Sequence, residues 1–212
     1  MGKKSSILAI MLLGVICTLF SCSIGNKNDS SLKENSITKV ELTEKEKMLL
    51  STGSDHQFAF NFNIGDKYNK LKLWIEKYKE GNLIPEDIQK SELAIDGDGM
   101  IIMTTEDIQV DTLNKRLLNI TVSDNNGYST IKTLRGVNEE KLGDMLSVMG
   151  INELDNNEID KEILLGTLCY SSKEMIESLN EDFFKEPSKN IDKLKDYDIA
   201  YLVKCEFIKE DQ

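Results

Sequence analysis

The feature that most constrains the fold is a segment in which large apolar residues alternate with smaller or polar ones. The large apolar positions are Phe58, Phe60, Phe62 and Ile64. Successive side chains of a β-strand point to opposite faces, so this period of two places all four side chains on one face. The segment therefore predicts a strand with one buried face.

A second segment with the same period follows the turn Gly65-Asp66-Lys67, with apolar residues at Leu71, Leu73 and Ile75. We expect it to be the antiparallel partner of the first strand, with the two apolar rows face to face. Trp74 alternates to the opposite face, where we expect a helix to cover it. A partner-binding aromatic is the alternative for Trp74.

Further strands are predicted from apolar and β-branched runs, at residues 92–95, 100–104, 117–123, 128–134, 163–170 and 199–208. Asn126-Gly127 is a hairpin turn signal between two of them. The run from Ile163 to Tyr170 is almost continuously apolar, as in a strand covered on both faces. The sequence therefore predicts about eight strands in all.

Helical spacing occurs in three places. A capping box from Thr43 to Glu46 predicts a short helix that ends before Gly53. Apolar residues from 142 to 149 repeat at i, i+3, i+4 and i+7 before Gly150, and a second capping box at 171–174 precedes similar spacing up to Phe183. These patterns predict a mainly β protein, an antiparallel β-sandwich with two or three short helices, with an α+β domain as the alternative.

The N-terminus has the order of a secretion signal. Lys3 and Lys4 precede an uncharged apolar run from Ile7 to Phe20. A transmembrane helix needs about 20 apolar residues, so this shorter run favours a cleaved signal over a stable span. We expect residues 1–21 to be removed.

The end of that signal, Leu19-Phe20-Ser21-Cys22, resembles the lipobox of bacterial lipoproteins, although Phe20 is larger than the residue usual at its position. A thiolate is a far better nucleophile than a hydroxyl, so Cys22 is the expected site of diacylglyceryl attachment. Cys17 follows the bulky Ile16 and does not fit. The alternatives are a conventional signal peptide, an uncleaved anchor and N-myristoylation at Gly2.

Composition limits the partners of the mature chain. The full sequence carries 26 basic and 37 acidic residues, and removal of two lysines with the signal changes the net charge from −11 to −13. Such an acidic chain does not favour nucleic acid or anionic headgroups as partners. Residues 22–40, rich in Ser, Asn and Lys, are expected to form the lipidated Cys and a flexible tether, and residues 41–212 a single β-rich extracytoplasmic domain.

Several stretches of this sequence are typical of one group of proteins: the segments from Leu42 to Lys47, Phe58 to Phe62, Trp74 to Gly81 and Tyr197 to Tyr201. With the lipobox, they resemble small uncharacterised lipoproteins of low-GC Gram-positive bacteria. The resemblance covers most of the mature chain. It implies a compartment and a β-rich fold, and no activity.

Residues that could carry chemistry are few. His56 is the single histidine, and we expect it to be exposed rather than a zinc ligand. Asp96-Gly97-Asp98-Gly99 is predicted to be a tight turn, because an EF-hand loop would need glycine where Ile101 stands. Ser129 and Lys132 have Ser-x-x-Lys spacing, but on a strand that spacing points them to opposite faces.

Cys169 and Cys205 lie in two predicted apolar strands. We expect buried free thiols, with an extracytoplasmic disulfide as the alternative. The sequence thus predicts no catalytic, metal or cofactor-binding residues, and one lipid-attachment residue, Cys22. We expect a membrane-anchored lipoprotein, held by the lipid on Cys22, that acts as a non-enzymatic module binding an unknown protein or envelope partner. A cell-envelope hydrolase that uses an unrecognised carboxylate site is the alternative.

Overall fold

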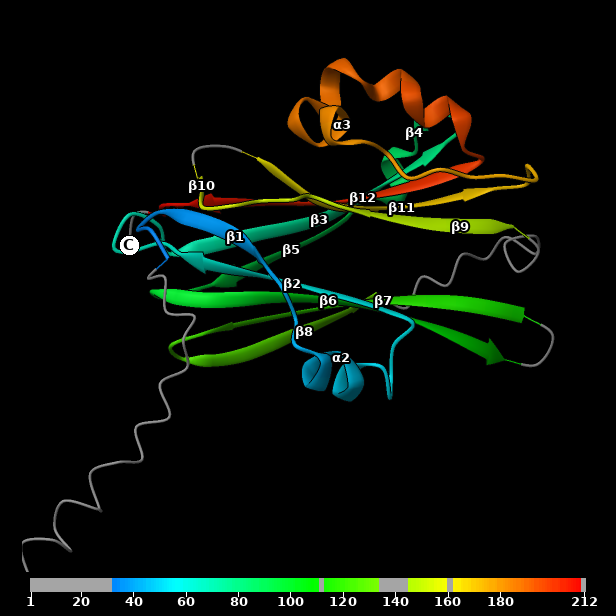
Figure 1. Ribbon diagram of the computed structural model, residues 1–212. Helices are drawn as coiled ribbons and strands as arrows, with labels where there is room; N and C mark the ends of the chain where they lie inside the picture. The colour runs from blue at the N-terminus through cyan, green and yellow to red at the C-terminus, as the bar shows by residue number, and fades with distance from the viewer. Residues whose placement is uncertain (1–31, 111–112, 134–144, 160–161, 211–212) are drawn as a thin grey trace, which may run out of the picture. The chain divides into compact units, whose positions relative to one another are not determined.

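Two antiparallel β-sheets packed face to face form most of the computed structural model, which describes residues 32–110, 113–133, 145–159 and 162–210 (Figure 1). The first sheet has the strand order β10-β1-β2-β6-β7-β8. The second has the order β4-β3-β12-β11-β9, and β5 also pairs with β3. The predicted mainly β, antiparallel sandwich is confirmed.

The first sheet contains β1 (Ser36–Val40), β2 (His56–Asn63), β6 (Asp98–Val110), β7 (Leu113–Asp124), β8 (Gly127–Thr133) and β10 (Asn157–Glu158). The second contains β3 (Lys70–Lys79), β4 (Asn82–Leu83), β5 (Gln89–Ala94), β9 (Leu146–Ile151), β11 (Ile163–Ser171) and β12 (Ile199–Ile208). The helical segments are α2 (Glu44–Leu50), η1 (Pro85–Asp87), α3 (Glu181–Lys185), η3 (Pro187–Lys189) and η4 (Ile191–Asp196). Within the described ranges, no helix is long and apolar enough to cross a membrane.

The main core lies between the two sheets. Phe60 and Phe62 of β2 are fully buried there, together with Leu71 of β3 and Cys205 of β12. The rings of Phe62 and Phe207 meet edge to face, with centroids 5.3 Å apart. The alternation in β2 and β3 therefore does bury one face of each strand, as the sequence predicts.

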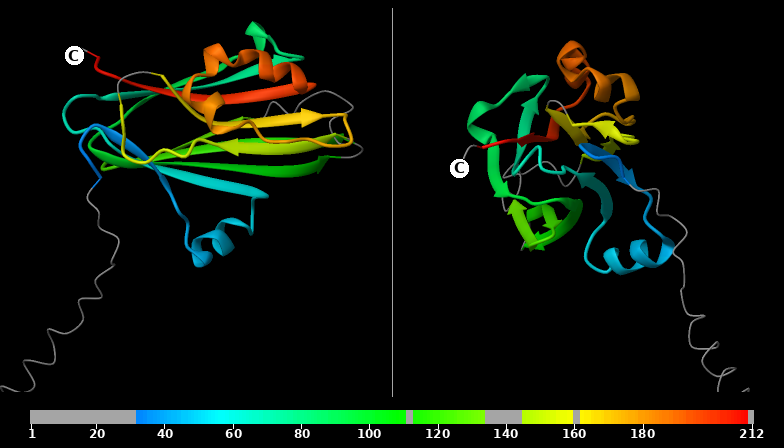
Figure 2. Two further views of the ribbon diagram at one scale, coloured as in Figure 1. Left: turned by 45° about the horizontal axis from the view of Figure 1, so that its top comes forward. Right: turned by 90° about the vertical axis from the view of Figure 1, so that its left-hand side faces the viewer.

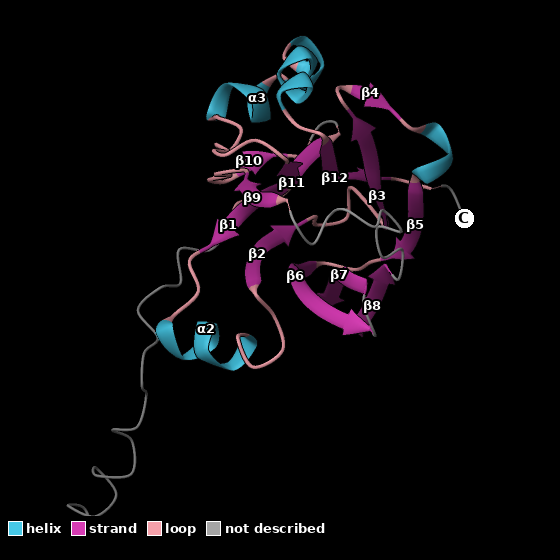
Figure 3. Ribbon diagram, turned by 90° about the vertical axis from the view of Figure 1, so that its right-hand side faces the viewer, coloured by secondary structure: helices cyan, strands magenta, loops and turns pink. Residues whose placement is uncertain are grey.

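A second apolar layer lies on the outer side of the second sheet. The helix α3 lies over this side of the sheet (Figure 3), and Phe183 of α3 and Leu194 of η4 belong to one buried cluster with Cys169 and Leu202. All nine residues of β11 are buried, because this strand is covered by the first sheet on one side and by the helical segments on the other. This confirms the prediction of a strand covered on both faces.

The expected tether boundary at Val40 is wrong. Residues Ser36–Val40 form β1, which pairs with β2 in a register that places Ile37 opposite Phe62. Ile37 is fully buried in the core between the sheets. The segment is polar overall, but one well-placed isoleucine and a neighbouring strand with free backbone groups are enough to order it.

The expected hairpin between the first two apolar strands is also wrong. β2 pairs with β1 and β6, whereas β3 pairs with β12, β4 and β5, so residues 64–69 carry the chain from one sheet to the other. The two apolar rows still face each other, across the sandwich rather than within a sheet. Alternation specifies the buried face of a strand and does not specify its neighbour.

The helix predicted to end at Gly150 is replaced, where the structure describes it, by strand β9; residues 134–144 lie outside the described part. β9 pairs with β11, with Gly150 opposite Thr167. Val148 packs under the helical segments and Met149 packs inward, so apolar residues are needed on both faces. Burial on both faces removes the periodicity that separates strand from helix.

The helix predicted after the second capping box is wrong over residues 172–180, which form no regular element. Ser171 belongs to β11, and the backbone N–H and the hydroxyl of Ser172 donate to Asp198 Oδ2 at 2.6 and 3.0 Å. The helix begins only after Asn180, whose Oδ1 accepts from the Phe183 N–H. The Ser172 hydroxyl therefore makes its hydrogen bond just after the end of β11 and does not cap a helix.

Two local predictions are confirmed. α2 has the complete capping box, with the Thr43 hydroxyl accepting from the Glu46 N–H and the Glu46 carboxylate accepting from the Thr43 N–H. β7 and β8 form a hairpin, but Asp124 pairs with Gly127, so its two loop residues are Asn125 and Asn126, one position earlier than expected.

Candidate functional site

The structure disperses the residues that the sequence singled out for chemistry. Cys22 lies outside the described residues. His56 is exposed at the start of β2, and the tight turn around Gly97 joins β5 to β6. Ser129 and Lys132 pair with Val122 and Asn119 on β7, which places them on opposite faces of the sheet.

Metal chemistry finds no support among the described residues, where no group of three or more His, Cys, Asp or Glu side chains could hold an ion. Cys169 and Cys205 are both free and buried, as expected for core thiols. They belong to different layers, because Cys169 packs under the helices and Cys205 packs between the sheets. Burial raises the pKa of Cys169 to about 12 and that of Cys205 still further.

A polar cluster on the outer face of the second sheet is the best-connected group of side chains. The Glu76 carboxylate accepts from Trp74 Nε1 at 3.0 Å and from the Tyr78 hydroxyl at 2.9 Å. Lys204 Nζ lies 3.0 Å from Glu76 and 2.8 Å from Glu162. Burial, followed by the bond to Glu76, raises the pKa of Tyr78 well above its ordinary value.

Trp74 is only partly buried and lies outside the apolar layer that the helices cover, so the predicted helix cover over it is wrong. Its indole N–H already donates a hydrogen bond to Glu76, which is two residues further along β3 and so lies on the same face. Trp74 is therefore part of this polar cluster.

The cluster is arranged for stability rather than for hydrolysis. One ammonium group binds both carboxylates, which holds Glu76 and Glu162 close together, as a carboxylate-based hydrolase would require. A glycosidase, however, needs one carboxyl group that keeps its proton and one with a free oxygen. Both oxygens of Glu76 already accept hydrogen bonds, Oε1 from Trp74 and Lys204 and Oε2 from Tyr78, so neither oxygen is free.

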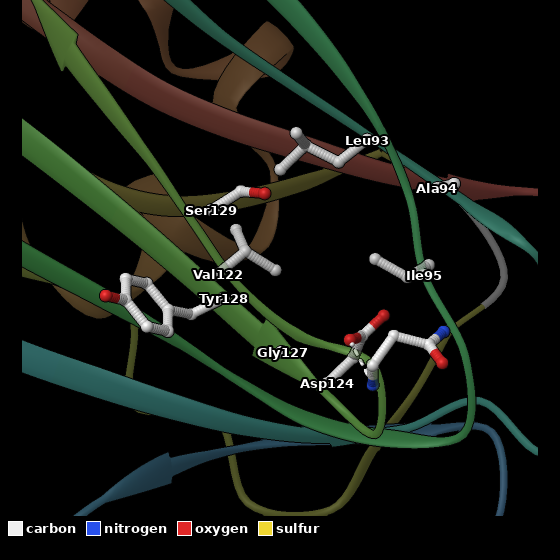
Figure 4. Close-up of a pocket in the computed structure, with 9 residues that line it drawn as sticks. Leu93, Ala94, Ile95, Val122, Asp124, Gly127, Tyr128 and Ser129 are labelled. Carbon is white, nitrogen blue, oxygen red and sulfur yellow. Dashed lines mark hydrogen bonds between the residues drawn. The ribbon is translucent and has the colours of Figure 1, made fainter.

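One hollow lies between the free edges of the two sheets, beside β5 and β8. Leu93, Ile95 and Val122 line it, and the ring of Tyr128 points away from them (Figure 4). Its volume is about 160 Å³. Ligand pockets usually measure about 300 to 1,000 Å³, so this hollow has room for one side chain at most.

A larger hollow of about 390 Å³ lies between residues 172–180 and η4. Met175, Ile176 and Leu179 supply its apolar wall, and Tyr197 closes it. The polar residues that line it are Ser171, Lys173, Glu177, Ser178, Asn180, Lys193 and Asp196. The volume and the mixture of apolar and polar lining residues are those of a small-ligand or peptide site.

Fixed hydrogen bonds shape this larger hollow. The Tyr197 hydroxyl donates to the Glu177 carbonyl at 2.7 Å, and burial raises the pKa of Tyr197 to about 12. Lys173 Nζ donates to the Asp196 carbonyl and Lys193 Nζ to Asn180 Oδ1. These bonds fix residues 172–180 beside η4. Met175, in the same segment, remains 80% exposed.

The sequence predictions missed this hollow because they made a helix of the segment that forms its wall. No signal in the sequence indicates the hollow, because Met175, Ile176 and Leu179 have the spacing of one helix face and the 80% exposure of Met175 is visible only in the structure. The hollow is the feature of the described domain that best fits a binding site.

Comparison with known proteins identifies the family of the chain and does not identify a ligand. No curated protein matches the chain, and no solved structure matches it. The YgaN domain model matches residues 36–207, from the first residue of β1 to the last residue but one of β12. The matched range also places the start of the domain at β1 rather than at Glu41. By a match that covers most of its length, the chain belongs to the YgaN domain family.

Proposed function

We propose that this protein is a membrane-anchored lipoprotein whose YgaN domain is a non-enzymatic binding module, held outside the cell by the lipid on Cys22. The observation that carries the binding half of this proposal is the hollow of about 390 Å³ between residues 172–180 and η4. A cavity of that size, built from a non-repetitive segment on a rigid sandwich, is the usual arrangement of a binding site.

The anchoring half rests on sequence. Leu19-Phe20-Ser21-Cys22 follows a charged start and an apolar run, and a diacylglyceryl group on Cys22 would supply the two acyl chains that stable anchoring requires. The described domain begins at Leu32, so a short linker connects the two. A flexible linker of about ten residues spans roughly 16 to 19 Å, enough to hold a folded domain beside a membrane.

The lining of the hollow suggests the class of ligand. Met175, Ile176 and Leu179 offer an apolar wall, while Lys173 and Glu177 are among its polar lining residues. An amphipathic ligand, with one apolar group and a polar or charged end, would match both parts. Apolar contact would supply most of the affinity and the polar residues would fix the orientation.

Site-directed photo-crosslinking in intact cells tests the binding proposal. A diazirine amino acid is placed at Met175, in the wall of the hollow, or at Leu83, an exposed apolar residue of β4 outside it. We expect a discrete crosslinked species from position 175 and none from position 83. Identical products from both positions, or none from either, would contradict a ligand in this hollow.

A further inference from the structure

The helix α2 projects from the first sheet, and its neighbours in the described part of the chain leave it largely exposed. It lies in the connection between β1 and β2 (Figures 1 and 2). None of its seven residues is buried. Met48 is 64% exposed and Leu49 60% exposed. Leu50, partly exposed, extends this apolar run to three consecutive residues.

Such a helix gains little from the rest of the domain. A seven-residue helix is marginal in water, and most helical stability in proteins comes from packing an apolar face. α2 has its capping box instead. Among the described residues the other strongly exposed large apolar side chains, at Leu83, Tyr128, Leu146 and Met175, have no second strongly exposed apolar residue next to them in the sequence. The pair in α2 is therefore the exposed apolar feature that most needs a partner.

The start of the domain indicates which partner is near. The described chain begins at Leu32 and enters β1, which leads directly to α2, and both lie on the same side of the domain in Figure 3. Nine residues lie between Cys22 and Leu32. If Cys22 carries the lipid, the linker keeps α2 within a few nanometres of the membrane surface.

Charge determines which part of the domain can make that contact. The mature chain has a net charge of −13, which opposes approach of the domain as a whole to an anionic membrane. α2 itself is neutral, since Glu44 and Glu46 balance Lys45 and Lys47. Contact through α2 therefore adds apolar burial without added repulsion.

We propose that α2 is a membrane-contact element, with Met48 and Leu49 inserted into the headgroup and acyl boundary of the leaflet that holds the lipid anchor. This inference rests on the proposed anchoring at Cys22. The affinity of two side chains for a bilayer is weak alone. The anchor makes their insertion an intramolecular event, for which a weak affinity suffices.

The test is hydrogen–deuterium exchange of the chain from Cys22 to Gln212 on vesicles. Cys22 is coupled chemically to a maleimide lipid in vesicles of phosphatidylcholine with phosphatidylglycerol. Cys169 and Cys205 are buried and do not compete. We expect amide exchange in residues 44–54 to slow about tenfold on coupling, as two apolar side chains leave water.

A double variant, Met48→Ser with Leu49→Ser, should lose this protection and keep the melting temperature, because both side chains are exposed. The matched control Met175→Ser should leave the protection unchanged. The proposal is overturned if α2 is not protected on coupling, or if the double variant is protected equally. Protection that depends on protein concentration and not on vesicles would assign the surface to a second copy, which also overturns it.

Chemical coupling separates this proposal from the anchoring proposal. If α2 is protected on coupled vesicles but Cys22 is not lipidated in cells, the anchor is wrong and the contact surface survives. If Cys22 is lipidated in cells and α2 is unprotected on coupled vesicles, the contact surface is wrong.

Discussion

Lys204 Nζ lies 3.0 Å from Glu76 Oε2 on the outer face of the second sheet, with 11% of the Lys204 side chain and 14% of the Glu76 side chain exposed. This pair joins β12 to β3, which are neighbours along their whole length. Loss of one partner from a nearly buried pair leaves a charge without compensation. The pair should therefore contribute more to the free energy of unfolding than the exposed ion pairs do.

We expect Lys204→Met to lower the free energy of unfolding by about 2 to 3 kcal/mol, since Glu76 would keep only neutral donors. Urea unfolding followed by Trp74 fluorescence measures the loss, because the indole bonds to the same carboxylate. The control is Lys185→Met, which removes an exposed pair with Glu181 and should cost less than about 0.5 kcal/mol. Equal losses in both variants would contradict the structural role of the cluster.

Phe60 tests the core between the sheets. It is fully buried opposite Ile101, and Phe60→Ala should cost about 3 to 5 kcal/mol through lost contacts and the cavity left behind. Denaturant unfolding of the mature chain measures this. A loss below about 1 kcal/mol would mean that the assigned inward face of β2 is wrong.

The success of that face assignment and the failure of the hairpin have one explanation. The period of β2 is a local property, and it showed which side of the strand is buried. Pairing is a long-range property, because β2 lies between β1 and β6, and Phe60 is about forty residues from its neighbour Ile101. Only a two-residue turn such as Asn125-Asn126 fixes a neighbour locally.

The candidate site was the least predictable part. Met175, Ile176 and Leu179 have the spacing of a helix face, yet they line a hollow because Ser172 is held by Asp198 at the start of β12. That contact joins residues 26 apart in sequence, and no local pattern indicates it. Likewise β9 is a strand because β11 needs a partner on that edge.

Asp198 gives the domain a pH dependence of known sign. The backbone N–H of Ser172 and, less strongly, its hydroxyl hold the pKa of Asp198 below its ordinary value. Because the folded pKa is the lower one, this stabilisation is present above the unfolded value of about 3.9 and is lost as the pH falls through the folded pKa.

Asp198→Asn should therefore cost about 1 kcal/mol at neutral pH, a value reduced for solvent screening of this partly exposed carboxylate, and the loss should shrink below about pH 4. Unfolding curves measured from pH 3 to pH 7 test this, with Glu174→Gln, an exposed carboxylate of residues 172–180, as the control. A loss that is equal at all pH values would contradict the stated role of the Asp198 charge.

The two core thiols should be inert in the folded protein. Burial raises the pKa of Cys169 to about 12, so only about one thiol in ten thousand would be ionised at pH 8. We expect Cys169 and Cys205 to react with Ellman's reagent only after unfolding, and the melting temperature to be insensitive to reductant. A linked pair of peptides in a non-reduced digest would contradict the assignment of free thiols.

The most direct test of the whole account is metabolic labelling of cells that express the full chain with an alkyne fatty acid, followed by mass spectrometry of the N-terminal peptide. We predict label on the wild type, none on Cys22→Ala, and wild-type labelling of the matched variant Cys17→Ala, with a mature chain that begins at acylated Cys22. Label retained on Cys22→Ala, or a wild-type chain that begins elsewhere without acyl groups, would contradict the account of a lipid-anchored binding module.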